Sequence, residues 1–139
     1  MLKGIDPLLT PELLHALAAM GHGDVIAIVD RNYPAYSAGV PVVDLPGADL
    51  VAVLGAVLSV LPVDPFAEPA ARHMLQDDGA PGPAVPDAQD VLDAAEGRAV
   101  PFVGMARQEF YVAARSARVV VRTAEDRPYA CVTVAKGVL

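Results

Sequence analysis

The chain has 139 residues, of which 54% are hydrophobic and only 5% aromatic, so Ala, Val and Leu supply a core sufficient for one domain over residues 1–139. The net charge of -7 excludes the basic face with which nucleic-acid-binding proteins neutralise phosphates. The single cysteine, Cys131, excludes an intrachain disulfide and a multi-cysteine metal site.

No hydrophobic stretch reaches the length that a membrane requires. The first six residues contain no apolar signal core, and the longest apolar run, residues 50–61, ends at Pro62. That run is well short of the ~20 residues that a transmembrane helix needs. We therefore expect a cytoplasmic protein with neither a membrane nor a nucleic acid as its partner.

The first half of the chain alternates between helical and strand patterns. Residues 10–12 (TPE) are typical of a helix start, and Gly21 is expected to end that helix as a C′ glycine. The β-branched run at residues 24–29 predicts a buried strand, and residues 41–45 predict a second one. Residues 48–61 are apolar nearly all round, which predicts a helix buried on several sides.

The segment after that helix gives weaker signals. Residues 66–75 are ambiguous, and within them residues 72–75 are a candidate for a strand edge. Residues 76–86 contain two aspartates, two glycines and three prolines, which predicts a mobile loop. The patterns that follow predict a helix at 87–96, a strand at 99–103 and a helix at 106–118.

The carboxyl-terminal part contains two apolar runs, residues 119–123 and 129–135, separated by a turn at 124–128. This order predicts an antiparallel hairpin. Taken with the alternation of helices and strands before it, the hairpin predicts an α/β fold. We expect a layered sandwich with a mixed, mostly parallel central sheet flanked by helices.

Two polar residues flank the first predicted strand. His22 lies between two glycines before the strand and is a candidate general acid or base, or an ordinary loop histidine. Asp30 ends the strand, where it is a candidate ligand-binding residue or an Asx-type cap. A strand this short still spans roughly 17–20 Å. The two residues are therefore expected to serve one site only if something else, such as a second subunit, joins them.

Polar candidates also occur late in the chain. Arg107 starts a helix, where the helix dipole disfavours a cation, so we expect a ligand or an ion pair to hold it. Tyr111 shares its helix face, and Tyr129 is expected to pack its ring and leave its hydroxyl for a partner. The histidines have no Cys, His or Glu at ligand spacing, so we expect no metal site.

Several stretches combine into a specific pattern. It is sharpest at residues 20–24 (MGHGD) and 30–35 (DRNYPA). The remaining stretches are residues 1–5, residues 8–14, Arg107 with 110–111, Tyr129, and residues 136–138. This combination, which runs nearly end to end, resembles the RbsD/FucU family of fucose mutarotases and ribose pyranases.

The resemblance implies an enzyme, an isomerase that interconverts the α and β anomers of L-fucose or a related monosaccharide without a cofactor. It implies an RbsD-like fold and a homo-oligomeric ring, commonly a decamer, with sites between neighbouring subunits. It assigns His22 as the proton donor and general acid or base. The positions that match the family's sugar-binding residues are Asp30, Arg107, Tyr129, Ala130 and Cys131.

The stretch 129–131 departs from the family's usual Tyr-Gly-Asn. The thiol of Cys131 replaces an amide that would hydrogen-bond a sugar hydroxyl, and a thiol is a much weaker partner. Fucose mutarotation is preferred because Arg107 with Phe110 and Tyr111 resembles that branch. The alternatives are a D-ribose pyranase and a non-catalytic monosaccharide-binding protein on the same fold.

Overall fold

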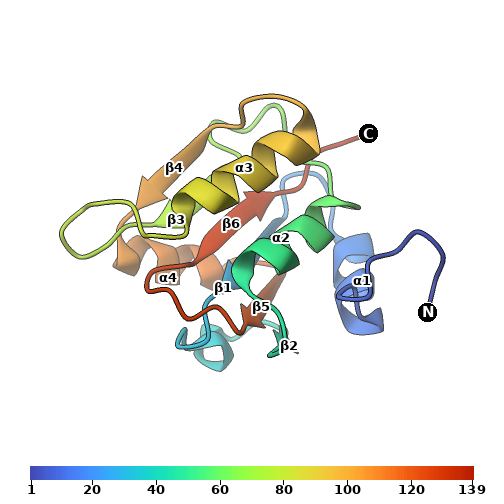
Figure 1. Cartoon of the computed structure of the whole chain (residues 1–139), viewed down its shortest axis with the longest axis horizontal. Helices are drawn as coiled ribbons and strands as arrows, with labels where there is room; N and C mark the ends of the chain where they lie inside the picture. Colours follow the sequence, from blue (N-terminus) through green and yellow to red (C-terminus); the bar gives the residue numbers. More distant parts are fainter.

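The computed structural model describes all residues 1–139, which fold into one six-stranded sheet with helices on both faces (Figure 1). The helices are α1 (Pro11–Ala19), α2 (Leu50–Leu58), α3 (Val85–Glu96), α4 (Arg107–Arg115) and a short 3-10 turn η1 (Ala35–Ala38). The strands are β1 (Val25–Val29), β2 (Val42–Leu45), β3 (Ala71–Met74), β4 (Phe102–Met105), β5 (Val119–Thr123) and β6 (Val132–Ala135). No helix is long and apolar enough to span a membrane.

The strands lie in the order β2-β5-β1-β6-β3-β4. β1 pairs in parallel with β5, β5 with β2, and β3 with β4, whereas β6 is antiparallel to both of its neighbours, β1 and β3. Five strands therefore run in one direction and β6 alone opposes them. The prediction of a mixed, mostly parallel sheet in an α/β fold is confirmed.

The predicted carboxyl-terminal hairpin is wrong. β5 and β6 follow one another in the chain, but β1 lies between them and pairs with both. The connection from 124 to 131 is too long for a tight hairpin turn, and it crosses the end of β1 instead. Because β1 is almost wholly buried, it needs a partner on each side for its backbone groups.

The alternation of side chains along β1 divides the core between the two faces of the sheet. Ile26 and Ile28 join the larger cluster with α1, α2 and α3, whereas Ala27 and Val29 join a smaller one around Phe110 of α4. Figure 1 shows α2 and α3 on the near face and α4 behind the sheet. The prediction that the apolar helix α2 is buried on several sides is confirmed, since it packs on both α3 and β1.

Several local predictions require adjustment. Thr10 caps α1 as expected, but the helix ends at an extended Met20, and Gly21 is not its left-handed C′ residue. The strand expected at 99–103 lies at 102–105, and the helix expected from 87 starts at Val85. β3 lies inside the sheet between β6 and β4, so it is not an edge.

A partly buried ion pair joins the β5–β6 connection to two helices. Glu125 accepts hydrogen bonds from Arg127 Nε (2.9 Å) and from the backbone N–H of Leu50 at the start of α2 (3.3 Å). Arg127 also reaches Asp87 in α3 (2.8 Å). The side chain of Glu125 is only 3% exposed. Its hydrogen-bonded pairing with Arg127 lowers the pKa of Glu125 to about 2.

This network predicts a specific loss of stability in acid. A carboxylate whose pKa is lower in the folded than in the unfolded chain stabilises the protein above the unfolded value of 4.5, and this contribution disappears as the pH falls through about 2. We expect Glu125→Gln to lower the unfolding free energy by about 3 kcal/mol at pH 7. Between pH 4.5 and 2, its free energy should fall less steeply than that of the wild type.

Urea unfolding at a series of pH values measures both effects. The exposed Glu68 provides the matched control, and Glu68→Gln should keep the wild-type free energy of unfolding at pH 7. Parallel pH profiles for Glu125→Gln and the wild type would contradict the assignment.

Candidate active site

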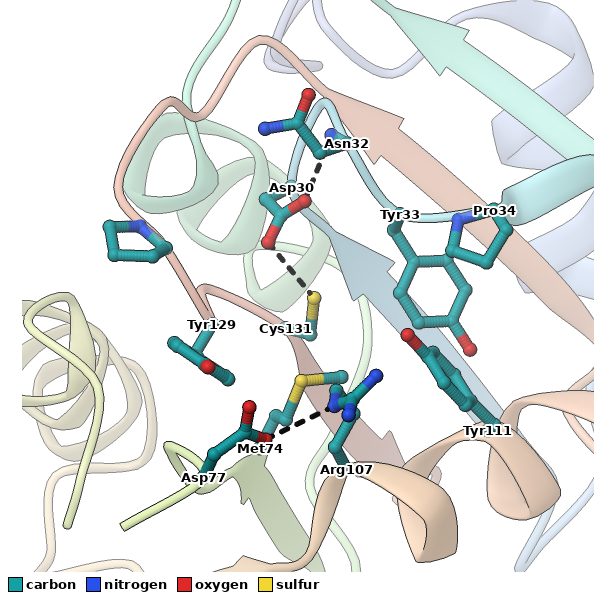
Figure 2. Close-up of a pocket in the computed structure, with 11 residues that line it drawn as sticks. Asp30, Asn32, Tyr33, Pro34, Met74, Asp77, Arg107, Tyr111, Tyr129 and Cys131 are labelled. Atoms are coloured by element: carbon teal, nitrogen blue, oxygen red, sulfur yellow. Dashed lines mark hydrogen bonds and ion pairs between the residues drawn. The ribbon is translucent and has the colours of Figure 1, made fainter. Parts of the chain in front are cut away.

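A cavity of about 410 Å³ opens beyond the strand ends on one side of the sheet, where β1, β3 and β4 end and β6 begins (Figure 2). The antiparallel direction of β6 is what brings its first residues to this edge, since Val132 pairs with Ile28 near the end of β1. The residues that line it are Asp30, Asn32, Tyr33, Pro34, Met74, Asp77, Arg107, Tyr111, Pro128, Tyr129 and Cys131.

Asp30 combines the two roles that were left open for it. Its Oδ1 accepts the backbone N–H of Asn32 (2.9 Å), which is the Asx-type turn, and its side chain also lines the cavity. Its Oδ2 accepts a hydrogen bond from Cys131 Sγ (3.5 Å). Only 8% of Asp30 is exposed, and this burial raises the pKa of its carboxyl group above the usual value.

The stretch from Tyr129 to Cys131 enters the cavity with only two of its side chains. Tyr129 has a φ of +58°, a left-handed conformation that is uncommon for an aromatic residue. This turn directs Tyr129 and Cys131 to the cavity, whereas Ala130 is buried in the larger core cluster. A sugar-contacting role for the Ala130 side chain is therefore not supported by its position.

Arg107 forms the ion pair that the sequence suggested and also lines the cavity. Its Nε lies 3.2 Å from Oδ1 of Asp77, and its Cζ lies 6.0 Å from the centre of the Tyr111 ring. These two neighbours, Tyr111 first and Asp77 next, raise the pKa of the Arg107 guanidinium. Figure 2 shows the guanidinium between them, so it is held at the cavity with a permanent positive charge.

His22 lies at the other end of β1 from Asp30, before the strand starts, and does not line the cavity. Its Nε2 is 3.1 Å from Oδ2 of Asp64, and its ring packs edge-on against Phe66 at 6.1 Å. The backbone N–H of Phe66, and then the His22 imidazole, lower the pKa of Asp64, so Asp64 is a carboxylate. The His22 side chain remains 49% exposed, which leaves its other face open to a partner.

The structure thus brings Asp30, Arg107, Tyr129 and Cys131 together and leaves His22 apart from them within one chain. No three His, Cys, Asp or Glu side chains come together as a metal site would require.

Sequence reasoning missed Asp64, Asp77 and Met74. Asp64 lies between prolines 62 and 65, and Asp77 lies in the loop that follows β3, so neither belongs to a periodic pattern. Asp64 and Asp77 are far in the chain from His22 and Arg107, the residues that they contact, so no local signal could have found them.

The chain resembles known proteins over its full length. A model of the RbsD / FucU transport protein family matches residues 3–139. The chain is 39% identical to the fucose mutarotase of Homo sapiens, covering 99% of this chain and 94% of that protein. The solved fucose mutarotase of Streptococcus pneumoniae, in complex with L-fucose, is 27% identical with a TM-score of 0.92, covering 99% of both chains.

A second solved structure, Bacillus subtilis RbsD complexed with D-ribose, is 23% identical with a TM-score of 0.76, covering 100% of this chain and 99% of that one. At that identity it shows the shared fold alone. The matches extend over both the cavity and the His22 region.

The environment of Cys131 predicts an unreactive thiol. Burial first, and then the neighbouring Asp30 carboxylate, raise the pKa of Cys131 well above its usual value, and the thiolate is the form that reacts. We expect iodoacetamide at pH 8 to label the folded protein at least ~100-fold more slowly than the unfolded protein. Mass spectrometry of timed samples measures this ratio, and fast stoichiometric labelling of the folded protein would contradict it.

Proposed function

The chain belongs to the RbsD / FucU transport protein family, and we propose that it is a cofactor-independent sugar mutarotase. As an isomerase, it interconverts the α and β anomers of L-fucose or a related monosaccharide. One observation carries the proposal. Asp30, Arg107 and Tyr129 converge on one cavity in a chain that a fucose mutarotase matches from end to end.

The cavity suits a monosaccharide because it combines polar groups of both kinds with flat ring surfaces. Asp30 offers carboxylate oxygens that accept hydrogen bonds from sugar hydroxyls, and Arg107 offers donors. The rings of Tyr111 and Tyr129 supply apolar faces against which the C–H groups of a pyranose can pack. A volume of about 410 Å³ lies in the range of small-ligand pockets.

The reaction opens and recloses a hemiacetal. A proton reaches the ring oxygen while another leaves the anomeric hydroxyl, and the open aldehyde rotates before it recloses on its other face. We assign His22 as the group that transfers the proton, a step worth roughly 10²–10⁴-fold in rate. Asp64 supports this role, because its carboxylate holds Nε2 of His22 and leaves Nδ1 free for the substrate.

His22 can reach the sugar only from a second subunit. In one chain, His22 and Asp30 lie at opposite ends of β1, so the five residues of that strand separate them. Its open face and the exposed Phe66 beside it support docking against the cavity of a neighbour. We propose a homo-oligomeric ring, a decamer by family resemblance, that acts in the cytoplasm, where a single free cysteine stays reduced.

D-ribose pyranase activity is the alternative within the same chemistry, and a non-catalytic sugar-binding protein is the alternative outside it. Fucose is preferred over ribose because fucose mutarotases match at 39% identity in sequence and at a TM-score of 0.92 in structure, against 23% and 0.76 for the ribose-bound RbsD. Cys131 stands where the family usually has an Asn, and its thiol donates to Asp30. The set of sugars that the protein accepts therefore has to be measured directly.

Magnetisation-transfer NMR on unlabelled sugars distinguishes the fucose mutarotase, the ribose pyranase and the non-catalytic binding protein. We expect the protein to accelerate exchange between the α and β signals of L-fucose, and His22→Ala to lower that rate at least ~100-fold. His15→Ala is the matched control, because His15 is an exposed histidine in α1, and it should keep the wild-type rate. Exchange with D-ribose only would favour the pyranase, and saturable binding without any exchange would exclude both enzymes.

Mixing two inactive variants tests the shared site. If His22 and Arg107 act from neighbouring subunits, co-assembling His22→Ala with Arg107→Ala at equal amounts restores about a quarter of the wild-type sites. Exchange of L-fucose should then rise well above that of either variant alone. Exchange that stays at the level of the parents, or a monomer by light scattering, would contradict a site built between subunits.

A further inference from the structure

Asp77 is an acid in the cavity that neither the fold nor the proposed proton transfer requires. It lies in the loop between β3 and α3, and its side chain points to Arg107 (Figure 2). Arg107 is its sole side-chain partner, through Oδ1 and the Arg107 Nε at 3.2 Å. This contact uses Nε and leaves the two terminal nitrogens of Arg107 without a carboxylate partner.

The loop around Asp77 is shaped by other residues. Gln76 donates its backbone N–H to Ala80 O (2.8 Å) and its side-chain amide to Pro81 O (2.8 Å). Asp78 accepts the backbone N–H of Ala80 (2.9 Å). Gly82 then packs on Tyr129 so closely that a Cβ there would lie 3.3 Å from the Tyr129 carbonyl oxygen. The loop is thus fixed at the cavity without the Asp77 side chain.

The ion pair contributes little to stability. The side chains of Asp77 and Arg107 are 65% and 43% exposed, and solvent-exposed pairs contribute little to folding. We therefore expect Asp77 to affect ligand binding, because its negative charge compensates the positive charge of Arg107 before any ligand enters the cavity.

Charge balance then decides which sugars fit. The cavity holds two acids, Asp30 and Asp77, against one cation, Arg107. An anionic sugar that reached the terminal nitrogens of Arg107 would lie beside the Asp77 carboxylate, and the two negative charges would repel each other. We propose that Asp77 is a specificity-determining residue that makes this cavity accept neutral monosaccharides and reject sugar phosphates and sugar acids. This inference rests on the proposed function.

Two matched ligands test the proposal, methyl α-L-fucoside as the neutral one and α-L-fucose 1-phosphate as the anionic one. Both block the anomeric oxygen, so neither turns over, and their dissociation constants are measured by titration calorimetry. We expect the wild type to bind the fucoside at least 10-fold more tightly than the phosphate. Asp77→Asn removes the negative charge beside Arg107, and this preference should shrink by 10-fold or more.

Two control variants separate charge from shape. Asp77→Glu keeps the negative charge and should retain the rejection of the phosphate. Asp78→Asn removes the neighbouring acid while keeping an oxygen for Ala80, and should keep the wild-type preference. A simple loosening of the loop would weaken both ligands together and would not change their ratio.

The outcomes of this experiment are distinguishable from those for the proposed function. L-Fucose exchange in the wild type with an unchanged preference in Asp77→Asn would overturn the role of Asp77 alone. Equal affinity of the wild type for both ligands would overturn it as well. Binding of neither ligand to either protein, together with no exchange, would overturn the inference and the proposed function together.

Discussion

The central position of β1 constrains the rest of the molecule. It pairs in parallel with β5 on one side and antiparallel with β6 on the other, and its core residues are fully buried. A strand held in this way cannot bend, so the residues that flank it are kept apart by its full length. His22 and Asp30 are therefore separated by the most rigid part of the fold, and a joint role requires two copies of the chain.

The same strand also determines which residues can assemble the cavity. β6 opposes the direction of every other strand, so its first residues arrive where β1, β3 and β4 end. The pairing of Ile28 with Val132 places Cys131 beside Asp30, and the end of β4 leads directly into Arg107 of α4. If β6 had paired with β5 in a hairpin, Tyr129 and Cys131 would lie beside the end of β5 and not beside Asp30 at the end of β1.

Two basic side chains of the proposed site, His22 and Arg107, are each held by a carboxylate. Asp64 contacts Nε2 of His22 at 3.1 Å, and Asp77 contacts Nε of Arg107 at 3.2 Å. In each case the carboxylate contacts a single nitrogen of the basic group. A contact to one nitrogen orients the basic group and places no carboxylate on its remaining nitrogens.

The sequence by itself determined the type of most elements and the candidates His22, Asp30, Arg107 and Tyr129, because caps, hydrophobic periods and strand ends are local signals. Only the tertiary structure decided the strand order and the partners of those candidates. Asp64 and Asp77 lie 42 and 30 residues from the groups they contact, and β1 separates two strands that are consecutive in the chain. Such contacts depend on which strands share hydrogen bonds and a common core, and no local pattern encodes that choice.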